Sequence, residues 1–182
     1  DGLGTFAYRQ QLATVEGASG ALVDFDGDGD LDAVTTSRGH DALLWINNGS
    51  GEFLPSYQKL GPLTANHVTV GDIDGDGDLD VLIAARGGVR VWLNQSGVFR
   101  QSLLPPPRAD NVTRIEVGDL NGDGFVDAVT VGHDSLPIVW TYSDRQYSLQ
   151  AAIGQTTNVE QLLLRDVDGD GVQDVGEAGI PG

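Results

Sequence analysis

Residues 24–32 read Asp-Phe-Asp-Gly-Asp-Gly-Asp-Leu-Asp, and residues 72–80 read Asp-Ile-Asp-Gly-Asp-Gly-Asp-Leu-Asp. Two further copies of this pattern occupy residues 119–127 and 166–174. The copies begin at positions 24, 72, 119 and 166, so the steps between them are 48, 47 and 47 residues. Self-similarity at a fixed period of this size is the signature of a repeat architecture. The acidic loop therefore marks the unit from which the chain is built.

Aromatic residues keep the same register as the acidic loops. The tryptophans Trp45, Trp92 and Trp140 are 47 and 48 residues apart. A second set consists of Phe6, Phe53, Phe99 and Tyr147, with steps of 47, 46 and 48 residues. Three independent markers in one register make chance a poor explanation. At one per unit, the tryptophans are expected to pack between neighbouring units.

Each unit contains short apolar runs that are typical of strands. In the second unit these runs cover residues 67–71, 79–85 and 89–93, and a fourth begins at residue 98 and stops at the prolines 105–107. β-Branched and aromatic residues between Gly, Asn and Pro indicate strands and hairpins. No stretch of ten or more residues shows a helical period. Four strands in about 47 residues predict an all-β fold of antiparallel β-propeller blades.

The phase of the repeat divides the chain into three parts. Residues 1–23 are expected to hold the end of a preceding blade and the first strand of the next, because residues 1–6 match the turn and strand start at 49–53. Residues 24–165 hold the blades with their loops. Residues 166–182 hold the fourth loop and the start of a following module. We therefore expect part of a larger propeller, or one completed by another copy of the chain, since bare blade edges invite pairing.

The loop pattern has the ligand types that Ca²⁺ prefers. Calcium takes six to eight oxygen ligands, and glycines at loop positions 4 and 6 allow the tight turns that wrap an ion. We expect side-chain ligands at positions 1, 3, 5 and 9 and a backbone carbonyl ligand at position 7 of each loop, giving about four sites. The side chains are Asp24, Asp26, Asp28 and Asp32; Asp72, Asp74, Asp76 and Asp80; Asp119, Asn121, Asp123 and Asp127; and Asp166, Asp168, Asp170 and Asp174. The carbonyls are those of Asp30, Asp78, Phe125 and Val172.

Two details refine this expectation. Asn121 replaces a carboxylate, so the third site should bind calcium more weakly. The side chains of Asp30 and Asp78 are expected to point to solvent. Metal-free acidic turns are the alternative reading, but four or five carboxylates in nine residues repel one another strongly unless a cation offsets them.

Composition excludes several functions. With 27 acidic and 10 basic residues the formal net charge is −17, which argues against binding to nucleic acid. No apolar run approaches the ~20 residues that a membrane span needs. There is no Cys, so disulfides, thiolate metal sites and cysteine nucleophiles are absent. The three His residues do not converge and no catalytic motif occurs, so we expect that the chain is not an enzyme. N-glycosylation sequons begin at Asn48, Asn94 and Asn111, the first two in hairpin turns that should be exposed.

The Asp-x-Asp-Gly-Asp-Gly-x-x-Asp loop between two apolar strands resembles the FG-GAP and VCBS repeats. Val-Gly-Asp at 70–72 and 117–119, and the stretch 45–53, fit that pattern, and the VCBS type is the closer match. The resemblance implies a calcium-binding propeller like the head of integrin α-subunits, with the ion between the first and second strands of each blade. It also implies a protein outside the cell or on its surface, with a protein or glycan as partner.

The fourth loop departs from the other three. Arg165 stands where the second and third units have Gly71 and Gly118. Glu177 falls at position 12 counted from Asp166, which is the bidentate ligand position of an EF-hand loop. The stretch 168–182 is similar to a loop in the B-type repeats of serine-aspartate-repeat surface adhesins. Both a second calcium-stiffened module and a degenerate last blade fit this pattern.

Three functions are therefore open. The first is a binding or adhesion module in which calcium is structural. The second is a subunit of a cell-surface fibre, a homo-oligomer in which neighbouring protomers complete each other's blades. The third is an accessory domain of a carbohydrate-active enzyme.

Overall fold

The computed structural model describes residues 8, 10–12, 19–37, 39–61, 64–102, 111–143, 146–154 and 159–179. Within these ranges the chain forms strands, turns and bends, and no helix. No described segment is therefore a helix that is long and apolar enough to cross a membrane. The expected strand start at residues 1–6, the strand end at the prolines 105–107 and residues 180–182 lie outside the described residues.

The strands form three four-stranded antiparallel sheets and one hairpin, each paired in sequence order. Blade 1 contains β1 (Ser19–Val23), β2 (Asp32–Thr36), β3 (Ala42–Asn47) and β4 (Phe53–Leu60). Blade 2 contains β5 (Ala65–Gly71), β6 (Asp80–Ala85), β7 (Gly88–Gln95) and β8 (Val98–Gln101). Blade 3 contains β9 (Val112–Gly118), β10 (Asp127–Gly132), β11 (Ile138–Ser143) and β12 (Gln146–Ala152). The terminal hairpin contains β13 (Val159–Arg165) and β14 (Asp174–Gly179).

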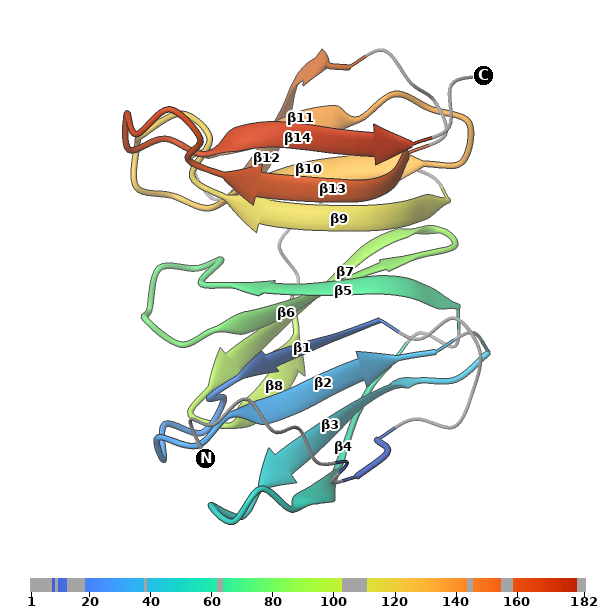
Figure 1. The fold of residues 1–182 in the computed structure, drawn as a ribbon, viewed down its shortest axis with the longest axis vertical. Helices are drawn as coiled ribbons and strands as arrows, with labels where there is room; N and C mark the ends of the chain where they lie inside the picture. The colour runs from blue at the N-terminus through green and yellow to red at the C-terminus, as the bar shows by residue number, and fades with distance from the viewer. Residues whose placement is uncertain are drawn as a thin grey trace.

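The sheets follow one another through space in chain order. The first strands β1, β5, β9 and β13 are successive neighbours, so each sheet faces the sheet before it and the sheet after it (Figure 1). All four acidic loops connect the first strand of a sheet to its second, and all four lie on the left-hand side in Figure 1. The predicted all-β fold of four-stranded antiparallel repeats is confirmed, and the sheets are blades of the propeller type.

The second strand of a blade is buried on both faces. All six residues of β6 are buried, because blades 1 and 3 cover the two faces of blade 2. Its register places Val81 opposite Val70 on β5 and Trp92 on β7. A strand that is buried on both sides carries a continuous apolar run instead of an alternating one. This explains the run Val-Leu-Ile-Ala-Ala at 81–85 that marks β6 in the sequence.

Three apolar clusters fill the spaces between neighbouring sheets. The first, between blades 1 and 2, includes Val34, Leu44, Val68 and Ile83. The second, between blades 2 and 3, includes Leu82, Val91, Ile115 and Trp140. The third, between blade 3 and the terminal hairpin, includes Val129, Val131, Val159 and Leu162. Burial of apolar side chains at these boundaries holds one blade to the next.

The tryptophans follow this pattern in part. Trp92 packs against the first cluster and donates its indole N–H to the carbonyl of Gly61, just after blade 1. Trp140 belongs to the second cluster, so these two tryptophans lie between blades as expected. The indole N–H groups of Trp45 and Trp140 bond to threonine hydroxyls at equivalent positions inside their own blades.

A side-chain amide also joins neighbouring blades. The amide of Gln58, on β4, donates to the carbonyl of Gly97 at 2.7 Å and accepts from the backbone N–H of Phe99 at 2.8 Å. Gln10 makes a similar pair of bonds, but with one residue: its amide donates to the carbonyl of Phe53 and accepts from the N–H of Phe53. In both cases a glutamine side chain imitates the backbone of a pairing strand.

Candidate metal-binding loops

The four acidic loops share one backbone shape. In the second loop, Gly75 and Gly77 have φ angles of 78° and 95°, a region that residues with a Cβ rarely adopt. The equivalent glycines of the other loops also have positive φ: Gly27, Gly29, Gly122, Gly124, Gly169 and Gly171. The glycines at positions 4 and 6 therefore allow the same tight wrap in every loop.

The aspartate at position 1 fixes this wrap. The carboxylate of Asp72 accepts hydrogen bonds from the backbone N–H groups of Gly75 at 2.8 Å and Gly77 at 3.0 Å. Asp24, Asp119 and Asp166 accept the equivalent pairs of bonds in their loops. In Asp119 burial raises the pKa, but four backbone N–H donors outweigh it and leave the pKa below its usual value.

Three carboxylates converge in three of the four loops. The residues at positions 1, 3 and 9 each bring an oxygen within 4.8 Å of the others: Asp24, Asp26 and Asp32; Asp72, Asp74 and Asp80; Asp166, Asp168 and Asp174. In the third loop Asn121 occupies position 3, so Asp119 and Asp127 are its only carboxylates at these positions. Clustered carboxylate oxygens are the donors that a hard divalent cation takes.

The aspartate at position 9 links the loop to the blade. Asp80 is 0% exposed; one of its oxygens accepts from the N–H of Ile73 in the loop at 2.8 Å, and the other accepts from the N–H of Asn94 on β7 at 2.8 Å. Asp32 and Asp127 are equally buried and make the equivalent pairs of bonds. Asp174 is exposed, and it accepts a hydrogen bond from the N–H of Val167, within the loop, at 3.0 Å.

Burial makes the ionised form of these carboxylates costly. Burial raises the pKa of Asp80 to about 6, since it outweighs the bonds from Asn94 and Ile73, and the nearby Asp74 and Asp76 add to the rise. Burial also raises the pKa of Asp127, and with neighbouring carboxylates it raises the pKa of Asp26 and Asp74. A divalent cation favours the ionised form of nearby acids and would offset this cost. The donor set therefore fits calcium.

The position 5 aspartates lie outside the three carboxylate triads. Asp28, Asp76, Asp123 and Asp170 each accept a hydrogen bond from the backbone N–H of position 7, at distances of 2.8 to 2.9 Å. These N–H donors belong to Asp30, Asp78, Phe125 and Val172. The backbone carbonyls of the same residues are the predicted position 7 ligands of calcium.

Two expected side-chain placements change. Asp78 was expected to point to solvent, but it is half-buried and accepts a hydrogen bond from the N–H of Ser96 at 2.8 Å. The half-buried Asp30 lies equivalently against Gly49. Both side chains lie at the turn between the third and fourth strands of their blade, and that of Asp78 is hydrogen-bonded to it. Glu177 lies outside the triad of the fourth loop: it is on β14, opposite Leu162 and against Gly154.

The prediction that the second sequon, which begins at Asn94, is exposed is also wrong. Asn94 is 1% exposed, and its side-chain nitrogen donates to the carbonyls of Phe25 and Leu79. A glycan cannot be attached to this nitrogen in the folded chain. Asn48 is exposed as expected, with its amide on Glu52. The period of the repeat indicates where Asn94 lies along its blade, but not that the neighbouring blade covers it.

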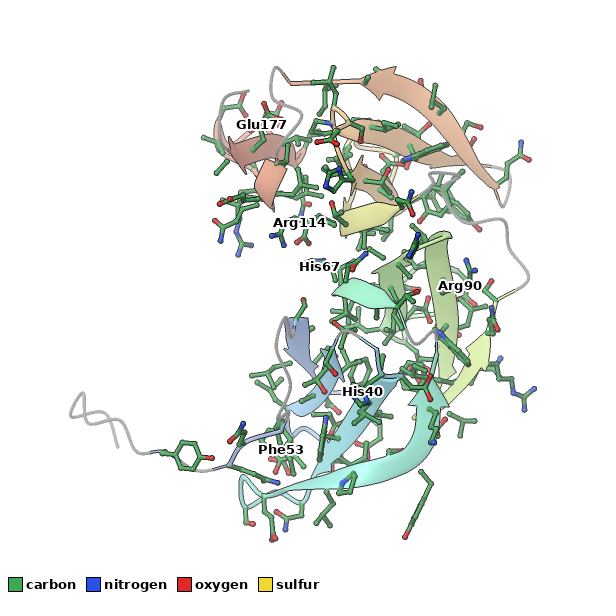
Figure 2. All side chains as sticks on the ribbon, turned by 90° about the vertical axis from the view of Figure 1, so that its right-hand side faces the viewer. His40, Phe53, His67, Arg90, Arg114 and Glu177 are labelled. Carbon is green, nitrogen blue, oxygen red and sulfur yellow. The ribbon has the colours of Figure 1, made fainter. Side chains whose placement is uncertain are left out.

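The histidines do not form a site. His40 and His133 are exposed, and Nδ1 of His133 lies 2.6 Å from a carboxylate oxygen of the adjacent Asp134. His67 lies between blades 2 and 3 near Arg114, and His40, which lies between β2 and β3, is away from it in space (Figure 2). Burial, followed by the charge of Arg114, lowers the pKa of His67.

Comparisons with known proteins match this architecture. A family model described as FG-GAP-like repeat matches residues 24–83 and 72–130. Among solved structures, the chain is similar to an Agrocybe aegerita lectin whose title describes specific recognition of non-reducing terminal N-acetylglucosamine. The identity is 25% and the TM-score 0.56, over 85% of this chain and 44% of the lectin chain. No curated protein matches the chain.

Proposed function

The chain belongs to the FG-GAP-like repeat family, as its loops predicted, and from that membership we propose that it is a calcium-stabilised module that binds a glycan or protein ligand outside the cell. The family match covers the first three acidic loops. Calcium binding, the extracellular location and the absence of enzymatic activity are parts of this proposal.

One observation carries the calcium part of the proposal. In three loops the carboxylates at positions 1, 3 and 9 each bring an oxygen within 4.8 Å of the others. The glycines at positions 4 and 6, with positive φ, allow the tight backbone turn that brings them together. Such a group of charges repels itself in the absence of a cation. The residues that would hold calcium are Asp24, Asp26 and Asp32; Asp72, Asp74 and Asp80; and Asp166, Asp168 and Asp174.

The role of the ion follows from what each loop connects. The loop joins the first and second strands, and in the three blades the position 9 carboxylate also bonds to the third strand. An ion bound to this carboxylate would hold the three inner strands of one blade in register. Calcium in this arrangement stabilises the fold and carries no reaction.

Chelation tests this role. A ligand that binds only the folded state at one hundred times its Kd stabilises that state by about 2.7 kcal/mol. In a chain of this length each kcal/mol moves Tm by about 2–4 °C, so each occupied loop should contribute roughly 5–10 °C. We expect Tm, measured by circular dichroism, to fall accordingly on transfer from millimolar calcium to excess chelator, and to return when calcium is restored. An unchanged Tm would show that the loops bind no stabilising ion.

The similarity to a lectin favours a glycan over a protein as the ligand. The chain spans 44% of that lectin, so the sugar that the lectin recognises is a starting point for this chain and no more. We propose glycans that end in N-acetylglucosamine as the first ligands to test. Binding to such glycans on an array, abolished by free N-acetylglucosamine, would support the proposal. Binding to no glycan at all would leave a protein ligand as the candidate.

A further inference from the structure

We propose that the first and second acidic loops, residues 24–32 and 72–80, bind calcium cooperatively. They are coupled through the turn at residues 94–97, which comprises the last two residues of β7 and the two residues before β8. This inference rests on the proposed function, because it takes the two loops to be calcium sites. It adds a specific role for Asn94, which is a positioning residue and has no part in the expected ligand set.

The turn is bonded to the second loop at several points. The backbone N–H of Asn94 donates to Asp80, the position 9 carboxylate, at 2.8 Å. The side-chain amide of Asn94 donates to the carbonyl of Leu79 at 3.2 Å, and the N–H of Ser96 donates to Asp78 at 2.8 Å. The position of the turn therefore depends on where the second loop holds Asp78 and Asp80.

The same turn contacts the first loop from the neighbouring blade. The side-chain nitrogen of Asn94 donates to the carbonyl of Phe25 at 2.9 Å. Phe25 lies between the carboxylates Asp24 and Asp26, and its own N–H donates to Asp32 at 3.0 Å. A methyl group on Gly97 would lie 3.1 Å from Cβ of Asp26, so the turn also packs against that side chain.

Asn94 has little freedom to break these contacts separately. It is 1% exposed, and its carbonyl oxygen accepts from the N–H of Gly97 at 2.8 Å. A buried polar group that loses its hydrogen-bond partner is destabilised, so the amide keeps its partners in both blades as the turn moves. Movement of one loop is thereby transmitted to the other.

The sign of the coupling is positive. Calcium at the second loop would order Asp80 and with it the turn, so that the first loop binds its ion with Phe25 and Asp26 already placed. A second ligand that meets an already ordered element has less conformational entropy to lose. Coupling of this kind is typically 5–150-fold in affinity and is reciprocal between the sites. We expect a factor of about ten here.

Asn47 provides a matched control in blade 1. It occupies the same register as Asn94: its N–H donates to Asp32, and its side-chain nitrogen donates to the carbonyl of Leu31 in its own loop. Its side chain hydrogen-bonds within blade 1, to the backbone of Leu31, Gly49 and Gly51. Asn47→Ala therefore removes the same local bond as Asn94→Ala without touching the contact between loops.

The experiment follows each loop by its own glycine amide. The N–H groups of Gly29 and Gly77 bond to Asp24 and Asp72, so their NMR signals report calcium in the first and second loops separately. The parent 182-residue chain is titrated with chelator-buffered calcium. The same titration is made on the single variants Asp24→Ala, Asn94→Ala and Asn47→Ala, and on two double variants that combine Asp24→Ala with each asparagine change. The quantity measured is the calcium midpoint of the Gly77 signal.

We expect Asp24→Ala to weaken calcium binding at the second loop about tenfold in the parent chain and in Asn47→Ala. In the Asn94→Ala background, Asp24→Ala should change the midpoint less than twofold. An unchanged midpoint for Asp24→Ala in the parent chain overturns the inference, and this arm needs no change at Asn94. A tenfold effect that persists in Asn94→Ala overturns the role of the turn. Absence of any calcium response at both Gly29 and Gly77 would instead refute the proposed function.

Discussion

The second and fourth acidic loops have the same ligand pattern in different surroundings. In both, three aspartates lie within 4.8 Å of one another and the two glycines have positive φ. Asp80 of the second loop is 0% exposed and bonded to β7, whereas Asp174 of the fourth loop is exposed. The residue at position 2 differs likewise: Ile73 is 2% exposed, and Val167 is 80% exposed.

The difference separates what a loop forms locally from what a blade adds. The wrap around positions 1, 4 and 6 needs only the nine residues of the loop, so it forms in both places. Burial of position 9 needs a third strand, which β13 and β14 do not have among the described residues. The triad of ligands is thus a local property, and its connection to the core is a property of the complete blade.

Removal of the position 9 carboxylate should give the largest difference in stability between changes in the second loop and changes in the fourth. Asp80→Ala leaves the buried N–H groups of Ile73 and Asn94 without their acceptor, at about 1–3 kcal/mol each, partly offset by the loss of a buried charge. We expect a net loss of about 2 kcal/mol in the free energy of unfolding, against less than about 0.5 kcal/mol for Asp174→Ala. Urea unfolding in chelator, followed by tryptophan fluorescence, measures both. Equal losses would show that the third strand adds nothing to the loop.

The pH dependence of the calcium-free chain should report the buried carboxylate of blade 2. The folded pKa of Asp80, about 6, is higher than that of an aspartate in an unfolded chain, about 3.9. Protonation therefore favours the fold: this contribution is fully present below the unfolded pKa and is lost as pH rises through 6. By linkage, lowering pH from 7 to 5 should stabilise the calcium-free fold by about 1 kcal/mol through this group.

Two controls sharpen this pH test. Asp80→Asn cannot titrate at this position, so its unfolding free energy should rise less over the same range. Calcium binds the ionised form, so the stabilisation gained from added calcium should shrink as pH falls from 7 to 5. Urea unfolding at both pH values, with calcium and with chelator, separates the two trends. A calcium-free chain that is less stable at pH 5 than at pH 7 would contradict the assignment.

Substitution of the position 6 glycine should affect both loops equally. Gly77 and Gly171 have φ angles of 95° and 91°, and no atom lies within 4 Å of the place where a Cβ would be added. Alanine would meet backbone strain alone, at about 1 kcal/mol. The calcium-bound loop must bear this strain, whereas the calcium-free loop can relax, so the calcium affinity of the loop that carries the change should fall by up to about fivefold. Titrations followed by the glycine amides Gly75 and Gly169 give the two affinities. A larger loss in one loop would show that its wrap is not purely local.

The sequence predicts most of the fold because each signal is local. The glycines and aspartates of residues 72–80 specify a turn, and the apolar runs on either side become β5 and β6. The continuous run at 81–85 indicates a strand that is covered on both faces. The ligand positions 1, 3 and 9 follow from the same spacing, and these are the carboxylates that the structure brings together.

What the sequence could not predict depends on contacts between units. Asn94 has the sequence of an exposed sequon, yet its amide is buried against Phe25, which lies 69 residues away. Asp78 holds the turn at Ser96, and Gln58 pairs with the backbone of Phe99, each through side-chain bonds that no period reveals. A period gives the position of a residue within its own blade. It does not give the residue that faces it in the next one.

The three apolar clusters each lie between two successive sheets, which has a consequence for how the chain comes apart. In a linear array of this kind, the free energy is close to a sum of one contribution per repeat and one per boundary. A cavity at Ile83 should therefore weaken blades 1 and 2 while hydrogen exchange at Leu162 stays nearly unchanged, because the two residues belong to different boundaries. Unfolding would then start at the boundary with the least buried surface and proceed along the array one sheet at a time.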